Sequence, residues 1–130
     1  MDKIVKAEDL DQWGDDYAGT IRDLFAENYM AIAPYEHPYE ALVNEDGDIL
    51  GASTFGFRHR DEGSFSITVT PDARRQGVAK KLVQSIVDQH KNTTLRPWVV
   101  NPVMAHLLEG MGFEPDGEWS QDNPYMERTP

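Results

Sequence analysis

The spacing of apolar residues changes along the chain, and each change predicts a different element. Between residues 15 and 29 apolar side chains recur every three or four positions, which predicts an amphipathic helix. Between residues 65 and 70 they alternate with polar ones, which is typical of a strand. The same reasoning predicts strands at 3–7, 41–43, 49–57, 65–70, 95–100, 113–119 and 125–128, and helices at 15–29, 77–90 and 102–111.

The order of these elements predicts an α/β domain with a mixed central sheet, flanked by helices. The Asp46-Gly47 pair between two apolar runs predicts a hairpin turn. Residues 30–39 contain two prolines and predict an irregular loop. Trp98, Leu107 and Phe113 are interpreted as core residues. With 130 residues and no repeats, residues 1–130 are expected to form one domain.

Composition narrows the classes of function. The chain carries 12 Lys and Arg against 23 Asp and Glu, a net charge of −11. Such acidity disfavours nucleic-acid binding and polybasic membrane association, since both need a basic surface. The lack of cysteine excludes disulfides, thiolate metal sites and a cysteine nucleophile. Without a recognisable signal peptide or a long apolar run, a cytoplasmic protein is expected.

Positive charge nevertheless gathers at one place. Arg74, Arg75, Lys80 and Lys81 lie within eight residues, at a predicted junction of strand, loop and helix that also contains Gly77. Unpaired N–H groups at a helix N-terminus favour phosphate, and glycine allows the backbone to approach it closely. The segment therefore predicts an anion site, although a basic cluster can also be a solvated helix face. It is neither a Walker A nor a dinucleotide-binding motif.

Residues 69–82 resemble motif A of the Gcn5-related N-acetyltransferase (GNAT) superfamily. They match its pattern Val-x-Pro-x-x-[Gln/Arg]-x-x-Gly-x-[Gly/Ala]-x-x-Leu at every fixed position. Residues 101–113, from Asn101 to Gly112-Phe113, are similar to motif B, and residues 46–51 resemble the usual second hairpin. The resemblance covers most of the chain in the expected order. It implies a single GNAT-type domain with a mixed, mostly antiparallel central sheet of about six or seven strands flanked by helices.

The resemblance implies acetyl-CoA as co-substrate. The pyrophosphate would lie on the backbone of the basic loop, the pantetheine arm would pair with the preceding strand, and Asn101 would contact that arm or shape the acyl pocket. The cofactor-binding residues so assigned are Ile67, Val69, Arg74, Arg75, Gln76, Gly77, Val78, Ala79, Lys80 and Asn101.

The resemblance further implies an N-acetyltransferase that moves an acetyl group to a primary amine by direct attack in a ternary complex. Many relatives place a proton-donating tyrosine where this chain has Leu108. The candidates for catalysis are His59 and Tyr125. The candidates for acceptor binding are Tyr29, Tyr35 and His37. The four histidines lack metal-ligand spacing, so no metal is expected.

The acceptor could be a small molecule or a protein amine, and the acidic body would favour a cationic one. Leu108 keeps open a second interpretation, a catalytically weak or inactive binding or structural protein with a GNAT fold, such as a phage component. A third is an unrelated α/β domain. Many relatives dimerise, so a homodimer is also open.

Overall fold

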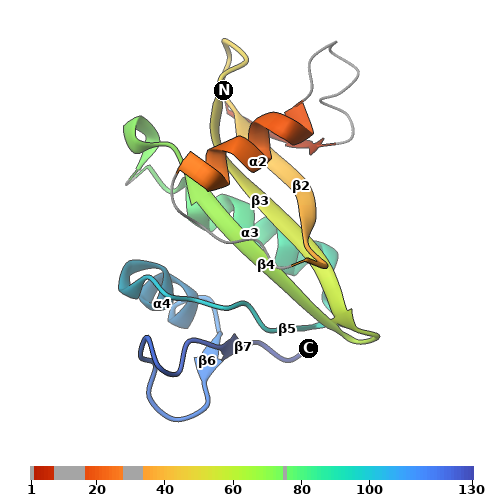
Figure 1. Ribbon diagram of the computed structural model, residues 1–130, viewed down its shortest axis with the longest axis vertical. Helices are drawn as coiled ribbons and strands as arrows, with labels where there is room; N and C mark the ends of the chain where they lie inside the picture. The colour runs from red at the N-terminus through yellow and green to blue at the C-terminus, as the bar shows by residue number, and fades with distance from the viewer. Residues whose placement is uncertain (1, 8–16, 28–33, 75) are drawn as a thin grey trace.

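The computed structural model describes residues 2–7, 17–27, 34–74 and 76–130, which form seven strands in two sheets and three α-helices (Figure 1). The strands are β1 (Lys3–Lys6), β2 (His37–Val43), β3 (Ile49–His59), β4 (Glu62–Val69), β5 (Thr94–Leu95), β6 (Glu114–Pro115) and β7 (Met126–Glu127). The helices are α2 (Tyr17–Glu27), α3 (Val78–Gln89) and α4 (Pro102–Glu109), with a short 3₁₀ turn at Pro71–Ala73.

The main sheet follows the chain in the order β1-β2-β3-β4-β5. Its first four strands are antiparallel, and β5 runs parallel to β4. The predicted α/β class with a mostly antiparallel mixed sheet is confirmed. The main sheet has five strands rather than about six or seven, because β6 and β7 form a separate two-stranded sheet.

The helices cover opposite faces of the main sheet (Figure 1). Helix α3 packs against Phe55, Phe65 and Ile67, and this cluster continues into α4 and Met126. On the other face, Ile21 and Phe25 of α2 pack on alternate residues of β2 and β3. Because side chains alternate along a strand, the two apolar clusters use different residues of the same strands.

Two predicted boundaries are corrected. The predicted loop at 30–39 ends in strand, since β2 begins at His37. Pro38 is tolerated there because β1 pairs with β2 only from Glu40 onward, so the missing N–H leaves no gap in a ladder. The strand predicted over 95–100 ends at Leu95. Two residues later Pro97 has no N–H with which to extend the ladder.

Candidate functional site

Strands β4 and β5 diverge, and the divergence leaves one edge of β4 open (Figure 1). The pairing with β5 ends at Gly63, whose carbonyl accepts the N–H of Arg96 at 2.8 Å. Backbone groups alternate along a strand, so those of Phe65, Ile67 and Val69 point to the same side as those of Gly63. No described strand pairs with β4 along that stretch. The two strands thus form a V that opens towards the C-terminal end of β4.

The open edge leads to the N-terminus of α3. Gly77 caps this helix with φ +76°, and no side chain caps it. The first intrahelical bond runs from the N–H of Lys81 to the carbonyl of Gly77, at 3.1 Å. The amides of Val78, Ala79 and Lys80 therefore precede the helical hydrogen-bond ladder. A Cβ at Gly77 would meet no atom within 4 Å, so the space above this turn is open.

The predicted cofactor-binding residues around this turn differ in how far their side chains are exposed to solvent. Arg74, Gln76 and Lys80 are exposed, and Gln76 donates to the carbonyl of Asp72 at 3.1 Å. The side chain of Val78 is buried against the sheet, so only the backbone of this residue could face an anion. Arg75 lies outside the described residues.

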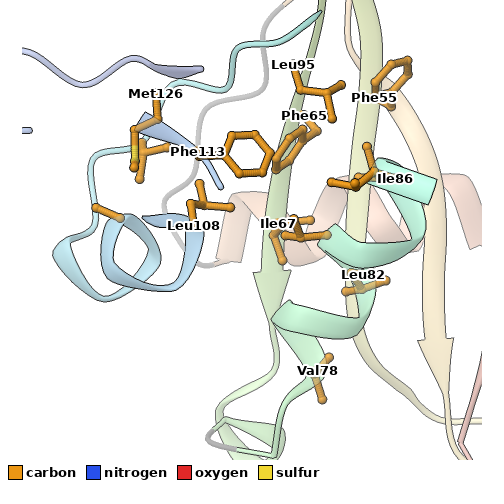
Figure 2. Close-up of a cluster of buried hydrophobic side chains, with 14 of the residues drawn as sticks. Phe55, Phe65, Ile67, Val78, Leu82, Ile86, Leu95, Leu108, Phe113 and Met126 are labelled. Carbon is orange, nitrogen blue, oxygen red and sulfur yellow. The ribbon is translucent and has the colours of Figure 1, made fainter. Parts of the chain in front are cut away.

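The side chain of Asn101 caps helix α4. Its Oδ1 accepts the N–H of Val103 at 2.8 Å. In this helix Leu108 is fully buried and is directed into the core cluster with Phe113 and Met126 (Figure 2). Leu108 therefore has a packing role at the position where many relatives have the tyrosine. Trp98, expected in the core, is instead 58% exposed, because buried Leu95 and Val99 take the inward positions.

A buried carboxylate that the sequence analysis missed lies on the α2 face of the sheet. Glu36 is only 6% exposed. Its Oε1 accepts hydrogen bonds from the hydroxyls of Thr54 and, at 2.9 Å, Ser66. Its Oε2 accepts one from Ser64 at 3.1 Å. The even spacing of Ser64, Ser66 and Thr68 places three hydroxyls on one face of β4, and this was the signal available in the sequence.

The two candidate catalytic residues lie apart from that carboxylate's hydrogen bonds. His59 is exposed at the end of β3, with Nε2 3.7 Å from the carboxylate of Glu62. Tyr125 bridges to Trp98 through the backbone, and the guanidinium of Arg96 lies 4.4 Å from the centre of its ring. Neither environment provides the buried acid–base partner that a proton-transfer role would favour.

The candidate acceptor residues are also separated. Tyr35 is half-buried, and its backbone lies against Gly56. His37 is exposed at the start of β2, opposite Phe55. Tyr29 lies outside the described residues. Between Tyr35 and His37 the chain turns Glu36 inward, so this segment contributes its acidic residue to the interior.

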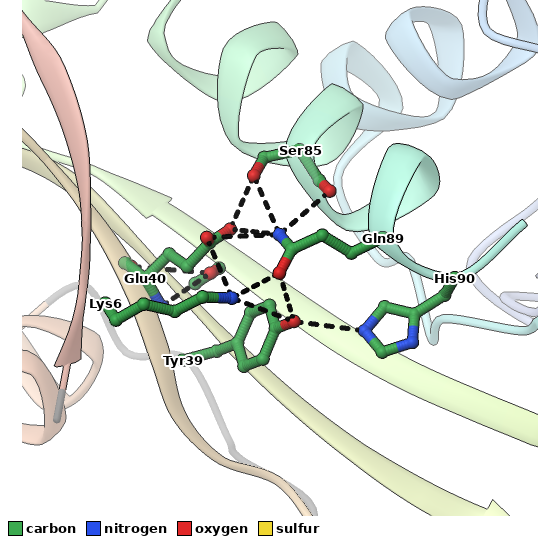
Figure 3. Close-up of polar contacts among 7 residues, drawn as sticks. Lys6, Tyr39, Glu40, Ser85, Gln89 and His90 are labelled. Atoms are coloured by element: carbon green, nitrogen blue, oxygen red, sulfur yellow. Dashed lines mark hydrogen bonds and ion pairs between the residues drawn. The ribbon is translucent and has the colours of Figure 1, made fainter.

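On the opposite face, a polar network joins β1 and β2 to α3 (Figure 3). Buried Glu40 accepts bonds from Ser85 at 2.7 Å and Gln89 at 3.1 Å, and it pairs with Lys6 at 3.2 Å. A register shift between Pro38 and Glu40 allows the adjacent Tyr39 to reach Gln89 as well. These interactions attach α3 to the sheet on the side away from Glu36.

The same network affects two ionisable groups. Burial, and secondarily the charge of Lys6, lowers the pKa of His90 below its usual 6.5. The pKa of Lys6 is raised: its burial acts to lower it, but the hydrogen bond to Tyr39 and the charge of Glu40 outweigh that effect.

The described part of the chain contains no group of three His, Asp or Glu side chains that could hold a metal ion. None of its helices is long and apolar enough to cross a membrane.

The fold agrees with what comparison with known proteins finds. Residues 37–115 match the model of the acetyltransferase (GNAT) domain. This match covers more than half of the chain, and the chain belongs to the GNAT family. No curated protein sequence matches it.

Solved structures show the same fold over nearly the whole chain. A GCN5-related N-acetyltransferase from Kribbella flavida is 19% identical, with a TM-score of 0.71 over 99% of this chain and 98% of that one. The yncA protein of Salmonella typhimurium, solved with acetyl-CoA, is 15% identical, with a TM-score of 0.75 over 99% and 94%. A GNAT-family acetyltransferase from Staphylococcus aureus is 12% identical, with a TM-score of 0.68 over 98% of both chains.

Proposed function

We propose that this protein is an N-acetyltransferase that transfers the acetyl group of acetyl-CoA to a primary amine, by direct attack in a ternary complex. The observation that carries the proposal is that the open edge of β4 leads to the N-terminus of α3, where no side chain occupies the first amides of the helix. A strand edge can pair with the amides of an extended chain, and a helix N-terminus can hold a phosphate. Acetyl-CoA contains both parts, and it supplies an acetyl group activated as a thioester.

The residues present fit this ligand. The amides of residues 77–80, in the open space at Gly77, would hold the pyrophosphate, with the charges of Arg74 and Lys80 beside it. Arg75 and Gln76 would belong to the same loop. The backbone of Ile67 and Val69 would pair with the pantetheine arm. Asn101 would act mainly through the start of α4, because its side-chain oxygen already caps that helix.

The acceptor would enter from the face that carries Glu36. The net charge of −11 would attract a cationic amine, whether a small molecule or a lysine of a protein. We place the reaction in the cytoplasm, without a nucleic-acid or membrane partner. A homodimer is compatible with this scheme.

A second candidate function is favoured by Leu108. Because this residue is buried in the core, it offers no proton for the departing thiolate. A GNAT-fold binding or structural protein would need none. The two functions differ in whether acetyl-CoA binds and is consumed in the presence of an amine.

Thermal unfolding during titration with acetyl-CoA tests the proposal. Ligand at 100 times its dissociation constant should stabilise the fold by about 2.7 kcal/mol. Arg74→Glu should weaken binding, whereas Lys91→Glu makes the same charge change beyond the other end of α3 and should not. No stabilisation of the wild type at millimolar acetyl-CoA would contradict the proposal and favour the binding or structural protein.

A further inference from the structure

Glu36 is a buried carboxylate for which the described residues provide no cationic partner. It is 6% exposed, and the ion pairs of the described residues do not include it. The three hydroxyls that donate to it are neutral. A buried charge with only neutral donors is costly to maintain.

The cluster lies beside the open edge of β4. Ser66 stands between Phe65 and Ile67, whose backbone groups face the V between β4 and β5, and its hydroxyl donates to Glu36 Oε1. Glu36 and Ser64 are buried, whereas Ser66 is partly exposed. Ser66 is therefore the member of the cluster that an incoming molecule can reach, with the carboxylate directly behind it.

We propose that Ser66 contacts the acceptor amine and that Glu36 receives the amine's proton through the Ser66 hydroxyl. This inference rests on the proposed function and assigns its acceptor site to the α2 face of the sheet. Ser66 is the catalytic residue in this scheme, and Glu36 is a positioning residue that acts through it. The substrate class that fits is a primary amine that arrives as an ammonium ion.

The proton step balances within these groups. One N–H bond of the ammonium ion breaks, and the proton joins the Ser66 oxygen as that oxygen gives its own proton to Glu36 Oε1. The products are a neutral amine, an unchanged serine and a neutral carboxylic acid. Nothing is oxidised or reduced. Two opposite charges disappear together, and this is favourable in a buried site, where isolated charges are poorly solvated. The neutral amine then has the lone pair that attack requires.

Two amines of similar size test the relay. Ethylamine is protonated at neutral pH, whereas the fluorines of 2,2,2-trifluoroethylamine keep it neutral, so only the first needs a proton acceptor before attack. Release of CoA from acetyl-CoA would be followed with each amine. Glu36→Gln and Ser66→Ala should lower turnover of ethylamine by about 10²-fold, the usual contribution of a general base. Turnover of trifluoroethylamine should fall much less.

The matched control is Thr68→Val. Thr68 is buried on the same face of β4, and its hydroxyl has no hydrogen-bond partner among the described residues. This variant should keep wild-type turnover of both amines. If Glu36→Gln and Ser66→Ala slow both amines equally, the cluster is only structural and the relay is wrong. The relay is also wrong if neither variant slows ethylamine.

A second measurement is independent of turnover. With CoA bound, ethylammonium chloride should shift the carboxyl ¹³C resonance of Glu36, which is identified by its absence in Glu36→Gln. Sodium chloride at the same ionic strength should not shift it, and Ser66→Ala should weaken the effect. No response of this resonance overturns the relay. If wild type binds acetyl-CoA but neither amine accelerates CoA release, the relay is overturned. The acetyltransferase proposal itself is contradicted instead when wild type does not bind acetyl-CoA.

Discussion

The backbone of Tyr35 passes directly over Gly56. A Cβ at Gly56 would lie 1.8 Å from the carbonyl oxygen of Tyr35, so only glycine fits beneath this segment. The contact fixes the residue that precedes Glu36 against β3, one strand away from Ser64 and Ser66. The geometry of the carboxylate cluster therefore depends on a glycine that has no functional group.

Gly56→Ala should displace the segment that holds Glu36. Because the clash is with backbone, the segment must move, at a cost of about 2 kcal/mol or more in the free energy of unfolding. Turnover of ethylamine should fall, while binding of acetyl-CoA should persist. Urea unfolding and thermal titration measure the two effects. Gly110→Ala is the control, since its nearest contact would be an ordinary 3.4 Å. Equal losses in both variants would contradict this prediction.

Comparison of Gly77→Ala with Gly47→Ala separates the effect of backbone strain on stability from the effect on acetyl-CoA binding. Gly77 and Gly47 both have positive φ, at +76° and +85°, and both have open space where a Cβ would be added. Alanine at either position should cost about 1 kcal/mol of stability. Only Gly77→Ala should also weaken the binding of acetyl-CoA, because Gly47 lies in the β2–β3 hairpin, away from the N-terminus of α3. Calorimetric titration of the two variants checks this, and equal affinities would place the pyrophosphate elsewhere.

The elements that the sequence predicts well are those with a strong local signal. The pattern of Val78, Leu82 and Ile86 predicts α3, and the structure has this helix from Val78 to Gln89. The Asp46-Gly47 turn is present, with Gly47 in the left-handed conformation. The fixed positions of residues 69–82 also predicted the family, which the domain match at residues 37–115 shows.

What the sequence does not predict depends on contacts between distant segments. The partners of Glu36 include Ser64 and Ser66, which lie about thirty positions away along the chain but adjacent to it in the fold. Trp98 is exposed although aromatic residues are usually packed, because β5 stops early and the inward positions are already filled. No local pattern contains this information, so the polar cluster could be found only from the fold.

Glu40→Ala should destabilise the protein without affecting the amine site. Its carboxylate is buried and accepts bonds from Ser85 and Gln89, which would lose their acceptor. We expect a loss of about 2 kcal/mol in the free energy of unfolding, the usual cost of leaving buried polar groups unpaired. As a control, Asp88→Ala removes an exposed carboxylate of helix α3, and it should cost about 0.5 kcal/mol or less in the free energy of unfolding. Urea unfolding distinguishes them, and a similar small loss in both would refute the prediction.

His90 should make the fold less stable in mild acid. Its ring stacks on Phe55, with centroids 4.1 Å apart and planes 12° apart, and burial lowers its pKa below 6.5. The unfolded chain therefore takes up the proton at higher pH than the folded one. The His90 contribution to stability is complete above about pH 6.5 and is lost as the pH falls through the folded-state value.

Replacing His90 tests this sign directly. His90→Gln removes the titrating ring. Between about pH 7.5 and about pH 5, a range that spans the usual histidine pKa of about 6.5, the urea midpoint of this variant should fall less than that of the wild type. The exposed His106 provides the control, and His106→Gln should follow the wild-type curve. If the wild type instead loses less stability on acidification than His90→Gln, Glu40 outweighs burial and Lys6 at His90, because only the charge of Glu40 favours the protonated ring there. That outcome would reverse the predicted sign, and the network joining β2 to α3 would then be tightest in acid.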